Sequence, residues 1–190
     1  MLIYSIPYSR IIAIFTAIFL FSCKTIQVND NRPFVRLTDD SQYFLLPPEN
    51  IEKSMDGFQS LYASYGENNF YANVWVIADE NGIDMSMMNE MGANIGELVW
   101  RDGLISFSSN IFPMSMPPEY IIADFQLCFF NASSLKSALE NIGLLFIETN
   151  NIRRILKNGN VITEITKNNN MVTIANYLRG YHFSLEGNFE

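Results

Sequence analysis

The chain has 190 residues, and its 20 acidic side chains against 12 basic ones give a formal net charge of -8. This balance disfavours a nucleic-acid-binding protein and electrostatic docking on anionic lipid head groups, because both need clustered Lys and Arg. Apolar residues make up 48% of the chain, so a packed core can form and disorder is disfavoured. The length suits one domain, which we expect to be a monomer.

The N-terminal segment has the pattern of an export signal. Arg10 precedes an uncharged, mostly apolar run over residues 11–21, which is too short to cross a bilayer as a helix. A basic residue before an apolar stretch of about 7–15 residues is typical of a secretory signal peptide. We therefore predict that residues 1–22 form a signal peptide.

The next residues resemble a bacterial lipobox, the sequence at which a lipid is attached to an exported protein. Leu20-Phe21-Ser22-Cys23 has a small residue before the cysteine, although Phe21 is bulkier than the common occupant of its position. The resemblance implies that Cys23 carries a fatty acid such as palmitate. It also implies that Lys24 favours the outer membrane, facing the periplasm. An ordinary cleaved signal is the alternative.

The rest of the chain reads as a tether followed by antiparallel strands. Residues 23–41 are rich in polar and turn-forming residues, so we predict a lipid-anchored tether there and a folded domain over residues 42–190. A first strand is expected over residues 43–46 and a hairpin around residues 66–69. Further turns are expected at three dipeptides that favour positive φ: Asn81-Gly82, Asp102-Gly103 and Asn158-Gly159. The C-terminal part adds a turn at residues 168–170 and a last strand over 181–185.

One predicted strand, over residues 70–78, is apolar on both faces. Trp75 and Ile77 would point to one side, and Val74 and Val76 to the other. This pattern is typical of a central strand that is covered on both sides.

Helix is predicted only in the middle of the chain. Pro117-Pro118-Glu119 suits a helix N-terminus, and the apolar residues after it recur at spacings of three and four. A second short helix is expected over residues 134–141. About six strands, two helices and four or five strands indicate a mainly β fold with a helical insertion, not alternating βαβ units.

Patterns for catalysis are scarce. His182 is the only histidine, and no second His or Cys pair offers a zinc site. The common nucleophile and phosphate-binding motifs are missing. We therefore predict no enzyme activity, no metal and no cofactor. Cys128 lies in an apolar stretch and is predicted to be a buried, inert thiol.

Asp124 interrupts the apolar segment of the predicted helix. Because a buried carboxylate needs a partner, we predict a structural polar role, with Arg153 and Arg154 as candidate partners. Direct contact with a ligand is the alternative.

Six of the eight methionines after Met1 lie between residues 85 and 116. Methionine is flexible and polarisable, so it conforms to irregular or variable apolar shapes. A core filled by flexible side chains is one interpretation, and a cavity for an acyl or other extended apolar ligand is the other. The predicted lining of that cavity is Met85, Met87, Met88, Met91, Phe107, Phe112, Met114, Met116, Tyr120, Phe125 and Phe129.

Several strings resemble a known family when they are taken in order over about residues 40–186. They include Tyr43-Phe44-Leu45-Leu46-Pro47-Pro48-Glu49, Leu98-Val99-Trp100-Arg101-Asp102-Gly103-Leu104, Pro117-Pro118-Glu119-Tyr120, Arg153-Arg154-Ile155-Leu156-Lys157-Asn158-Gly159 and Gly180-Tyr181-His182-Phe183-Ser184-Leu185. The family consists of bacterial outer-membrane lipoproteins of unknown function associated with aryl-polyene or fatty-acid-like biosynthesis clusters. It is similar to the lipoprotein-localisation factor LolB.

The resemblance implies a LolA/LolB-like antiparallel half-barrel whose concave apolar face is covered by helices. Such cavities hold acyl chains, so we expect an acyl chain, lipid or lipoprotein ligand and attachment to a membrane through the N-terminal anchor. LolB also inserts an exposed apolar loop residue into the membrane, for which Met87 or Met88 is a candidate analogue. A structural or interaction lipoprotein with a filled core is the alternative function.

Overall fold

The computed structural model describes residues 32–110 and 117–189. The predicted signal peptide and Cys23 lie outside these ranges. Within them the chain forms the following strands and helices: β1 (Phe34–Thr38), β2 (Ser41–Phe44), the 3-10 helix η1 (Pro48–Asn50), β3 (Met55–Tyr65), β4 (Asn68–Asp79), β5 (Gly82–Met88), β6 (Asn94–Arg101), β7 (Leu104–Ser109), α2 (Glu119–Phe129), α3 (Ala132–Glu140), β8 (Leu145–Thr149), β9 (Ile152–Lys157), β10 (Asn160–Asn168), β11 (Met171–Asn176) and β12 (Tyr181–Gly187).

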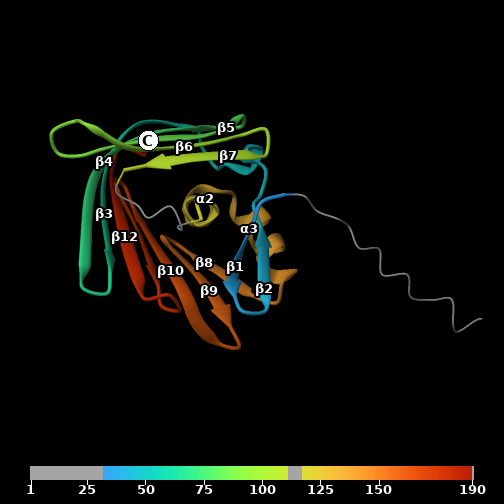
Figure 1. Ribbon diagram of the computed structural model, residues 1–190. Coiled ribbons are helices and arrows are strands. Elements are labelled where there is room, and N and C mark those ends of the chain that lie inside the picture. Colours follow the sequence, from blue (N-terminus) through green and yellow to red (C-terminus); the bar gives the residue numbers. More distant parts are fainter. Residues whose placement is uncertain (1–31, 111–116, 190) are drawn as a thin grey trace, which may run out of the picture. The chain divides into compact units, whose positions relative to one another are not determined.

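Ten strands form one antiparallel sheet in the order β7-β6-β5-β4-β3-β12-β11-β10-β9-β8. The pairing of β3 with β12 joins the strands before the helices to those after them, with Leu61 opposite Leu185. The sheet curves around α2 and is not closed, since β7 and β8 are its two edges (Figure 1). This arrangement confirms the predicted mainly β half-barrel with a helical insertion.

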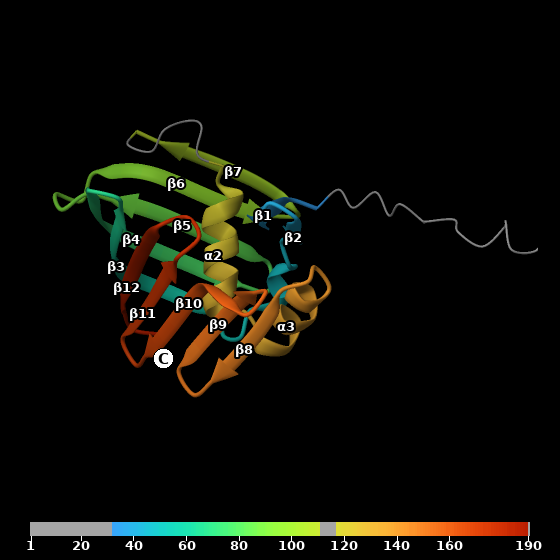
Figure 2. The same ribbon diagram turned by 90° about the horizontal axis from the view of Figure 1, so that it is seen from below.

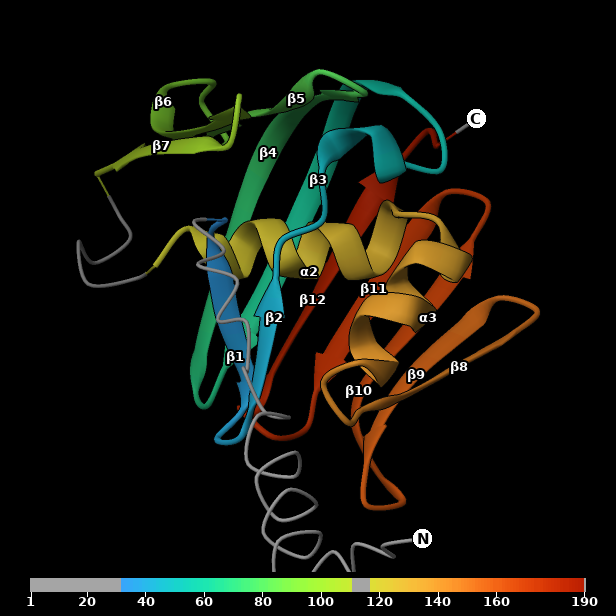
Figure 3. The same cartoon turned by 90° about the vertical axis from the view of Figure 1, so that its right-hand side faces the viewer.

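The two helices lie on the concave side of the sheet. Helix α2 crosses the inside of the curve, and α3 packs beside β8 (Figure 2). The β1–β2 hairpin stands next to α2, as Figure 3 shows from the side. Among the described residues, no helix has both the length and the apolar character needed to cross a membrane.

Two of the predicted turns form as their sequences indicate. Asp102 and Asn158 have φ values of 53° and 51°, and the glycine after each also has a positive φ, so β6–β7 and β9–β10 are tight hairpins. The turn at Asn81-Gly82 is different, because neither residue has a positive φ. The Asp79 carboxylate holds that turn instead, accepting the backbone N–H groups of Asn81 at 2.8 Å and Gly82 at 3.2 Å.

The predicted tether is partly wrong, because β1 occupies residues 34–38 inside it. Val35 and Leu37 point into the core, and β1 pairs with β2 through Phe34 opposite Phe44. The many polar neighbours concealed this short alternation of apolar and polar residues. The folded part therefore begins before residue 42.

The prediction that β4 is covered on both faces is also wrong. Val74 and Val76 are buried on the concave side, whereas Trp75 and Ile77 are 41% and 36% exposed on the convex side. Both helices lie on the concave side, so nothing in the described chain covers the other face of β4. The alternating pattern of β4 correctly predicts two apolar faces but does not predict which one is buried.

Candidate functional site

The concave face of the sheet is built from rows of apolar side chains that adjoin each other across the strands. The register places Phe70, Ala63 and Phe183 side by side on β4, β3 and β12. Farther along the sheet, Met85 adjoins Leu98 on β6. Because alternate residues of a strand face one side, the concave face is mainly apolar along these strands.

Helix α2 fills much of this interior. Every residue from Ile122 to Phe129 is buried, and the rings of Phe125 and Phe129 lie 4.8 Å apart between their centroids. A helix that is buried on all sides supplies core rather than a surface. The predicted amphipathic helix is therefore a central element around which the sheet is wrapped.

Beside α2, one part of the concave face is only half-buried. It consists of Leu61, Ala63, Phe70 and Phe183, which adjoin one another on β3, β4 and β12 and which we call the concave strip. Leu61, Phe70 and Phe183 pack against the core while remaining partly accessible. Such a surface can accept an extended apolar ligand without any chemical step.

A polar pair stands at one end of the concave strip. Asp124 on α2 accepts a hydrogen bond of 2.6 Å from the hydroxyl of Tyr181, which is two residues before Phe183 on β12. The Asn176 amide donates to the same hydroxyl at 3.3 Å. The predicted partners of Asp124 are therefore wrong, because its contact is with Tyr181 rather than with Arg153 or Arg154.

Burial controls the protonation of this pair. Loss of solvent raises the pKa of Asp124 to about 7, although the Tyr181 hydrogen bond and the nearby Arg179 charge act in the opposite direction. Burial also raises the pKa of Tyr181, and the negative charge of Asp124 raises it further. Asp124 is thus a carboxyl group that can exchange a proton near neutral pH inside an apolar interior.

Arg179 and Tyr120 border the same region. The Arg179 guanidinium lies 4.3 Å from the centroid of the Tyr120 ring, which projects from the first turn of α2. The same guanidinium donates to the backbone carbonyl of Arg36 on β1. These contacts connect the β11–β12 loop, α2 and β1 at the polar end of the concave strip.

Arg153 has a structural role, as predicted, but with other partners than Asp124. It is only 1% exposed, and its Nη1 donates to three carbonyl oxygens at the C-terminal end of α2, those of Leu127, Cys128 and Phe130, at 2.9 to 3.1 Å. Its other nitrogens pair with Glu148 at 2.6 Å and Glu52 at 3.1 Å. A cation suits the carbonyl end of a helix, so Arg153 fixes α2 to the sheet.

Arg154 points the other way, as the alternation of a strand requires. It pairs with Glu164 at 2.6 Å on the outer side of the sheet and remains partly exposed. The two neighbouring arginines, proposed as equivalent candidates, therefore have different roles.

Gln126 is a structural residue that was not singled out. It is fully buried on α2, and its Oε1 accepts the Tyr43 hydroxyl at 2.9 Å and the Leu46 N–H at 3.0 Å. Its Nε2 donates to the Leu46 carbonyl at 2.8 Å. The signal was the same as for Asp124, because both are polar residues in an otherwise apolar helix.

Four of the predicted cavity residues lie in the core. Met85 and Met87 are buried on the concave face of β5, and Phe125 and Phe129 are buried on α2. Phe107 and Tyr120 are half-buried against the same core. Phe112, Met114 and Met116 lie outside the described residues.

The other two methionines do not line the interior. Met88 pairs with Asn73 on the convex side of the sheet, because it follows the inward-pointing Met87. Met91 is 89% exposed in the loop between β5 and β6. The cluster of methionines in the sequence is thus split between the core, the outer face and a loop.

A cleft of about 570 Å³ lies between β2 and α3, not on the concave strip. Tyr43, Phe44, Ser134 and Ser137 are among its lining residues. The serine hydroxyls make this cleft more polar than the apolar cavity predicted from the methionines.

The remaining reactive residues have ordinary environments. Cys128 is buried and free, which confirms the predicted burial, and burial raises its pKa to about 12. His182 lies on the outer face, with its Nδ1 2.8 Å from the Ser64 hydroxyl. The described residues contain no group of three His, Cys, Asp or Glu side chains placed to hold a metal ion.

Residues 56–187 match the family described as "Protein of unknown function (DUF3261)". The chain belongs to this family. The DUF3261 match extends from β3 to β12, so it includes the concave strip, the polar pair and Arg153 but not β1 and β2. Among curated proteins, none matches the chain.

Proposed function

We propose that this DUF3261 protein is an outer-membrane lipoprotein, anchored through Cys23 and facing the periplasm, that binds an acylated or lipid-like ligand and passes it on. The concave strip with a polar pair at one end carries this proposal. An acyl ligand is likewise divided into a long apolar chain and a polar head at one end. The half-buried side chains would cover the apolar part, and Asp124 and Tyr181 would face the head.

The binding energy would come from removing apolar surface from water. Such burial contributes about 25 cal/mol per Å² of apolar area, so a chain that covers a few side chains can bind without any bond being made or broken. We therefore propose no catalytic role for these residues.

Titration with a fluorescent fatty-acid probe tests the binding. A soluble form that lacks residues 1–23 should bind the probe saturably and release it when unlabelled fatty acid is added. Phe183→Ser, on the concave strip, should weaken binding about tenfold, which corresponds to about 1.4 kcal/mol. Tyr62→Ser is the matched control, because Tyr62 lies across from Ser184 on the outer face and should leave binding unchanged. Equal effects of the two substitutions would contradict the proposed site.

Membrane attachment has a separate test. Cys23→Ala should abolish metabolic labelling of the protein with radioactive palmitate, because the only other cysteine, Cys128, is a buried thiol. Labelling that persists in the Cys23→Ala variant would reject the lipid anchor but not ligand binding.

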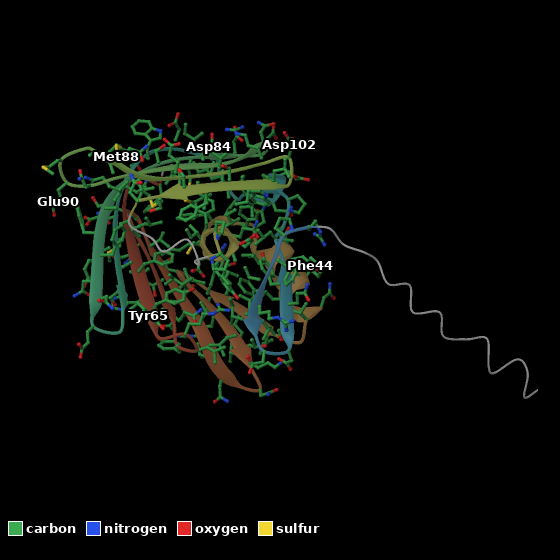
Figure 4. The ribbon with its side chains drawn as sticks, viewed as in Figure 1. Phe44, Tyr65, Asp84, Met88, Glu90 and Asp102 are labelled. Atoms are coloured by element: carbon green, nitrogen blue, oxygen red, sulfur yellow. The ribbon has the colours of Figure 1, made fainter. Side chains whose placement is uncertain are left out.

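The loop between β5 and β6 supports transfer at a membrane. Neither proposed analogue of an inserting residue fits, because Met87 is buried and Met88 is half-buried on the outer face. Met91 is the exposed residue, and Asn89 organises its loop by accepting the N–H groups of Met91 at 3.0 Å and Ala93 at 2.9 Å. Figure 4 shows Met88 and Glu90 at the end of the molecule where this loop extends.

An apolar tip on an ordered loop can enter a lipid surface at little cost in conformational entropy. Met91→Ser should therefore slow probe transfer to lipid vesicles while leaving the equilibrium affinity for the probe unchanged. Asn110→Ser, outside the loop, is the control substitution for the same measurement. An unchanged transfer rate for Met91→Ser would remove this loop from the proposal.

One observation favours a second candidate, a structural or interaction lipoprotein with a filled core. The uninterrupted burial of α2 from Ile122 to Phe129 occupies much of the concave side. Native mass spectrometry of the purified protein separates the two functions. A co-purified lipid would favour ligand binding, and a single ligand-free mass together with no saturable probe binding would favour the filled core.

A further inference from the structure

The convex face of the sheet carries an exposed aromatic patch that neither the concave site nor the lipid anchor uses. We define the convex patch as Phe58, Tyr62, Tyr71, Trp75 and Ile77, whose exposed fractions run from 36% to 48%. All five lie on β3 and β4, in the middle of the sheet. Contiguous exposed apolar surface of this kind is typical of an interaction site.

The side chains of the patch are placed by the strand register. Phe58 lies opposite Trp75, and their rings meet edge to face at a centroid distance of 5.5 Å. Tyr62 lies opposite Tyr71, and the Tyr62 hydroxyl donates to the Asn69 side chain at 2.9 Å. Aromatic side chains that are held in place before binding lose little entropy on contact, and they are common among the residues that dominate interface energies.

Carboxylates border the patch in the same rows. Asp56 and Asp84 flank Ile77 on its two sides. Glu186 of β12 lies opposite Ser60 of β3. Glu97 lies on β6, two strands from Trp75 in the row that runs through Ser86. Figure 4 shows Asp84 on the side of the sheet that faces away from α2.

These negative charges are largely uncompensated. Arg101 is the one Lys or Arg on the outer face of β3 to β7 and β12, and it is bound to Asp84, with its Nη2 2.6 Å from Oδ2. No cation of the described chain forms an ion pair with Asp56, Glu97 or Glu186. The convex patch is therefore an aromatic surface with an acidic border.

We propose that the convex patch docks another protein through a segment in which apolar side chains are flanked by Lys or Arg. The apolar side chains would cover the aromatic rings, and the basic ones would meet Asp56, Glu97 and Glu186. Opposite charges across an interface steer association and select the partner. A second copy of this chain would set acidic border against acidic border, and an anionic lipid surface would meet the same repulsion.

Site-specific photo-crosslinking of the full chain in cells tests this docking. A benzophenone amino acid replaces Tyr71 in the patch, or Thr166 on the outer face of β10 as the control position. We expect an adduct from position 71, absent from position 166, whose linked peptide contains Lys or Arg next to apolar residues. In the Asp56→Asn, Glu97→Gln, Glu186→Gln background the yield should fall at least fivefold, and Trp75→Ser should also lower it.

The purified carboxylate variants should unfold at unchanged denaturant concentrations, and Trp75→Ser should still unfold in one cooperative transition, so that a lost adduct reports docking and not misfolding. The proposal is overturned if position 71 gives no more adduct than position 166. It is equally overturned if the adduct is a lipid or a second copy, or if its yield does not depend on the three carboxylates. None of these outcomes depends on whether the concave strip binds an acyl ligand.

Discussion

The two faces of the same sheet differ more than their sequences suggest. On β4, Val74 and Val76 are buried against the helical side, while Trp75 and Ile77 alternate with them and remain exposed. The concave face is covered by α2 and β1–β2, and polar side chains attach these elements to it. The convex face is left with aromatic rings and carboxylates. An apolar face of a strand thus indicates a surface that needs a partner, and that partner can lie outside the chain.

The polar contacts of the interior explain why the helix stays on one face. Arg153 binds the C-terminal carbonyls of α2, Gln126 binds the segment after β2, and Asp124 binds Tyr181 on β12. Each contact satisfies groups that would be costly to bury alone. The described convex face has no comparable set of buried polar contacts, so substitutions on that face should lower the stability less than substitutions of the interior contacts.

The largest expected effect separates the neighbouring arginines. Arg153→Met should lower the free energy of unfolding by about 3–5 kcal/mol, because the carbonyls of Leu127, Cys128 and Phe130 lose their donor inside the protein. Arg154→Met removes only a partly exposed ion pair with Glu164 and should cost about 0–1 kcal/mol. Chemical denaturation measures both. Similar losses for the two variants would break the contrast between the faces.

The pH dependence of Asp124 gives the next effect. Its folded-state pKa is about 7 because of burial, whereas an unfolded chain has an Asp pKa of about 3.9. The folded state therefore keeps the proton longer, and this contribution to stability is present below about pH 4 and lost as the pH rises to about 7. As the pH rises through that window, the free energy of unfolding of Asp124→Asn should increase relative to that of the wild type by on the order of 1 kcal/mol per pH unit.

Unfolding free energies measured from about pH 2 to pH 8 check this difference, with the range above about pH 4 reporting on Asp124. Asp79 supplies a control of opposite sign, because the backbone N–H of Asn81 lowers its pKa. Its contribution is fully present above about pH 4 and is lost as the pH falls through the lowered pKa. The deficit of Asp79→Asn relative to the wild type should therefore be constant from about pH 4 to pH 8 and should shrink below about pH 4. A flat difference between Asp124→Asn and the wild type would contradict a proton-exchanging carboxyl in the interior.

The smallest effect compares adjacent residues of β4. Val74→Thr places a hydroxyl in the buried face and should cost about 1–3 kcal/mol. Trp75→Thr changes the exposed face and should cost about 0.5–1 kcal/mol, mainly through the lost contact with Phe58. Thermal or chemical unfolding ranks the pair, and a larger loss for Trp75→Thr would show that the convex patch is needed for folding.

Much of the secondary structure was predictable because it is encoded locally. Asp102-Gly103 and Asn158-Gly159 adopt the positive φ values that their side chains tolerate, and the hairpins follow from them. Pro117 and Pro118 mark the start of α2 for a similarly local reason. The β1 strand was missed because five residues with only two buried apolar side chains, Val35 and Leu37, give too weak a pattern.

The candidate site was less predictable, because its contacts join residues far apart in the chain. The methionine cluster indicated either a filled core or a cavity lining. Met85 and Met87 are buried, whereas Met91 is exposed because of where the β5–β6 loop extends. Asp124 was identified as unusual, yet its partner Tyr181 is 57 residues away. No local pattern distinguishes that tyrosine from the other aromatic residues.

The sequence by itself determined the order of the strands and helices apart from β1, the positions of the tight turns and the two-sided apolar character of β4. These depend on backbone preferences and on alternation, which act over a few residues. Only the tertiary structure decided that the helices cover one face, that Arg153 points inward while Arg154 points outward, and that Trp75 stays exposed. Those outcomes depend on which distant surfaces meet, because burial and hydrogen bonding act between elements that the sequence leaves far apart.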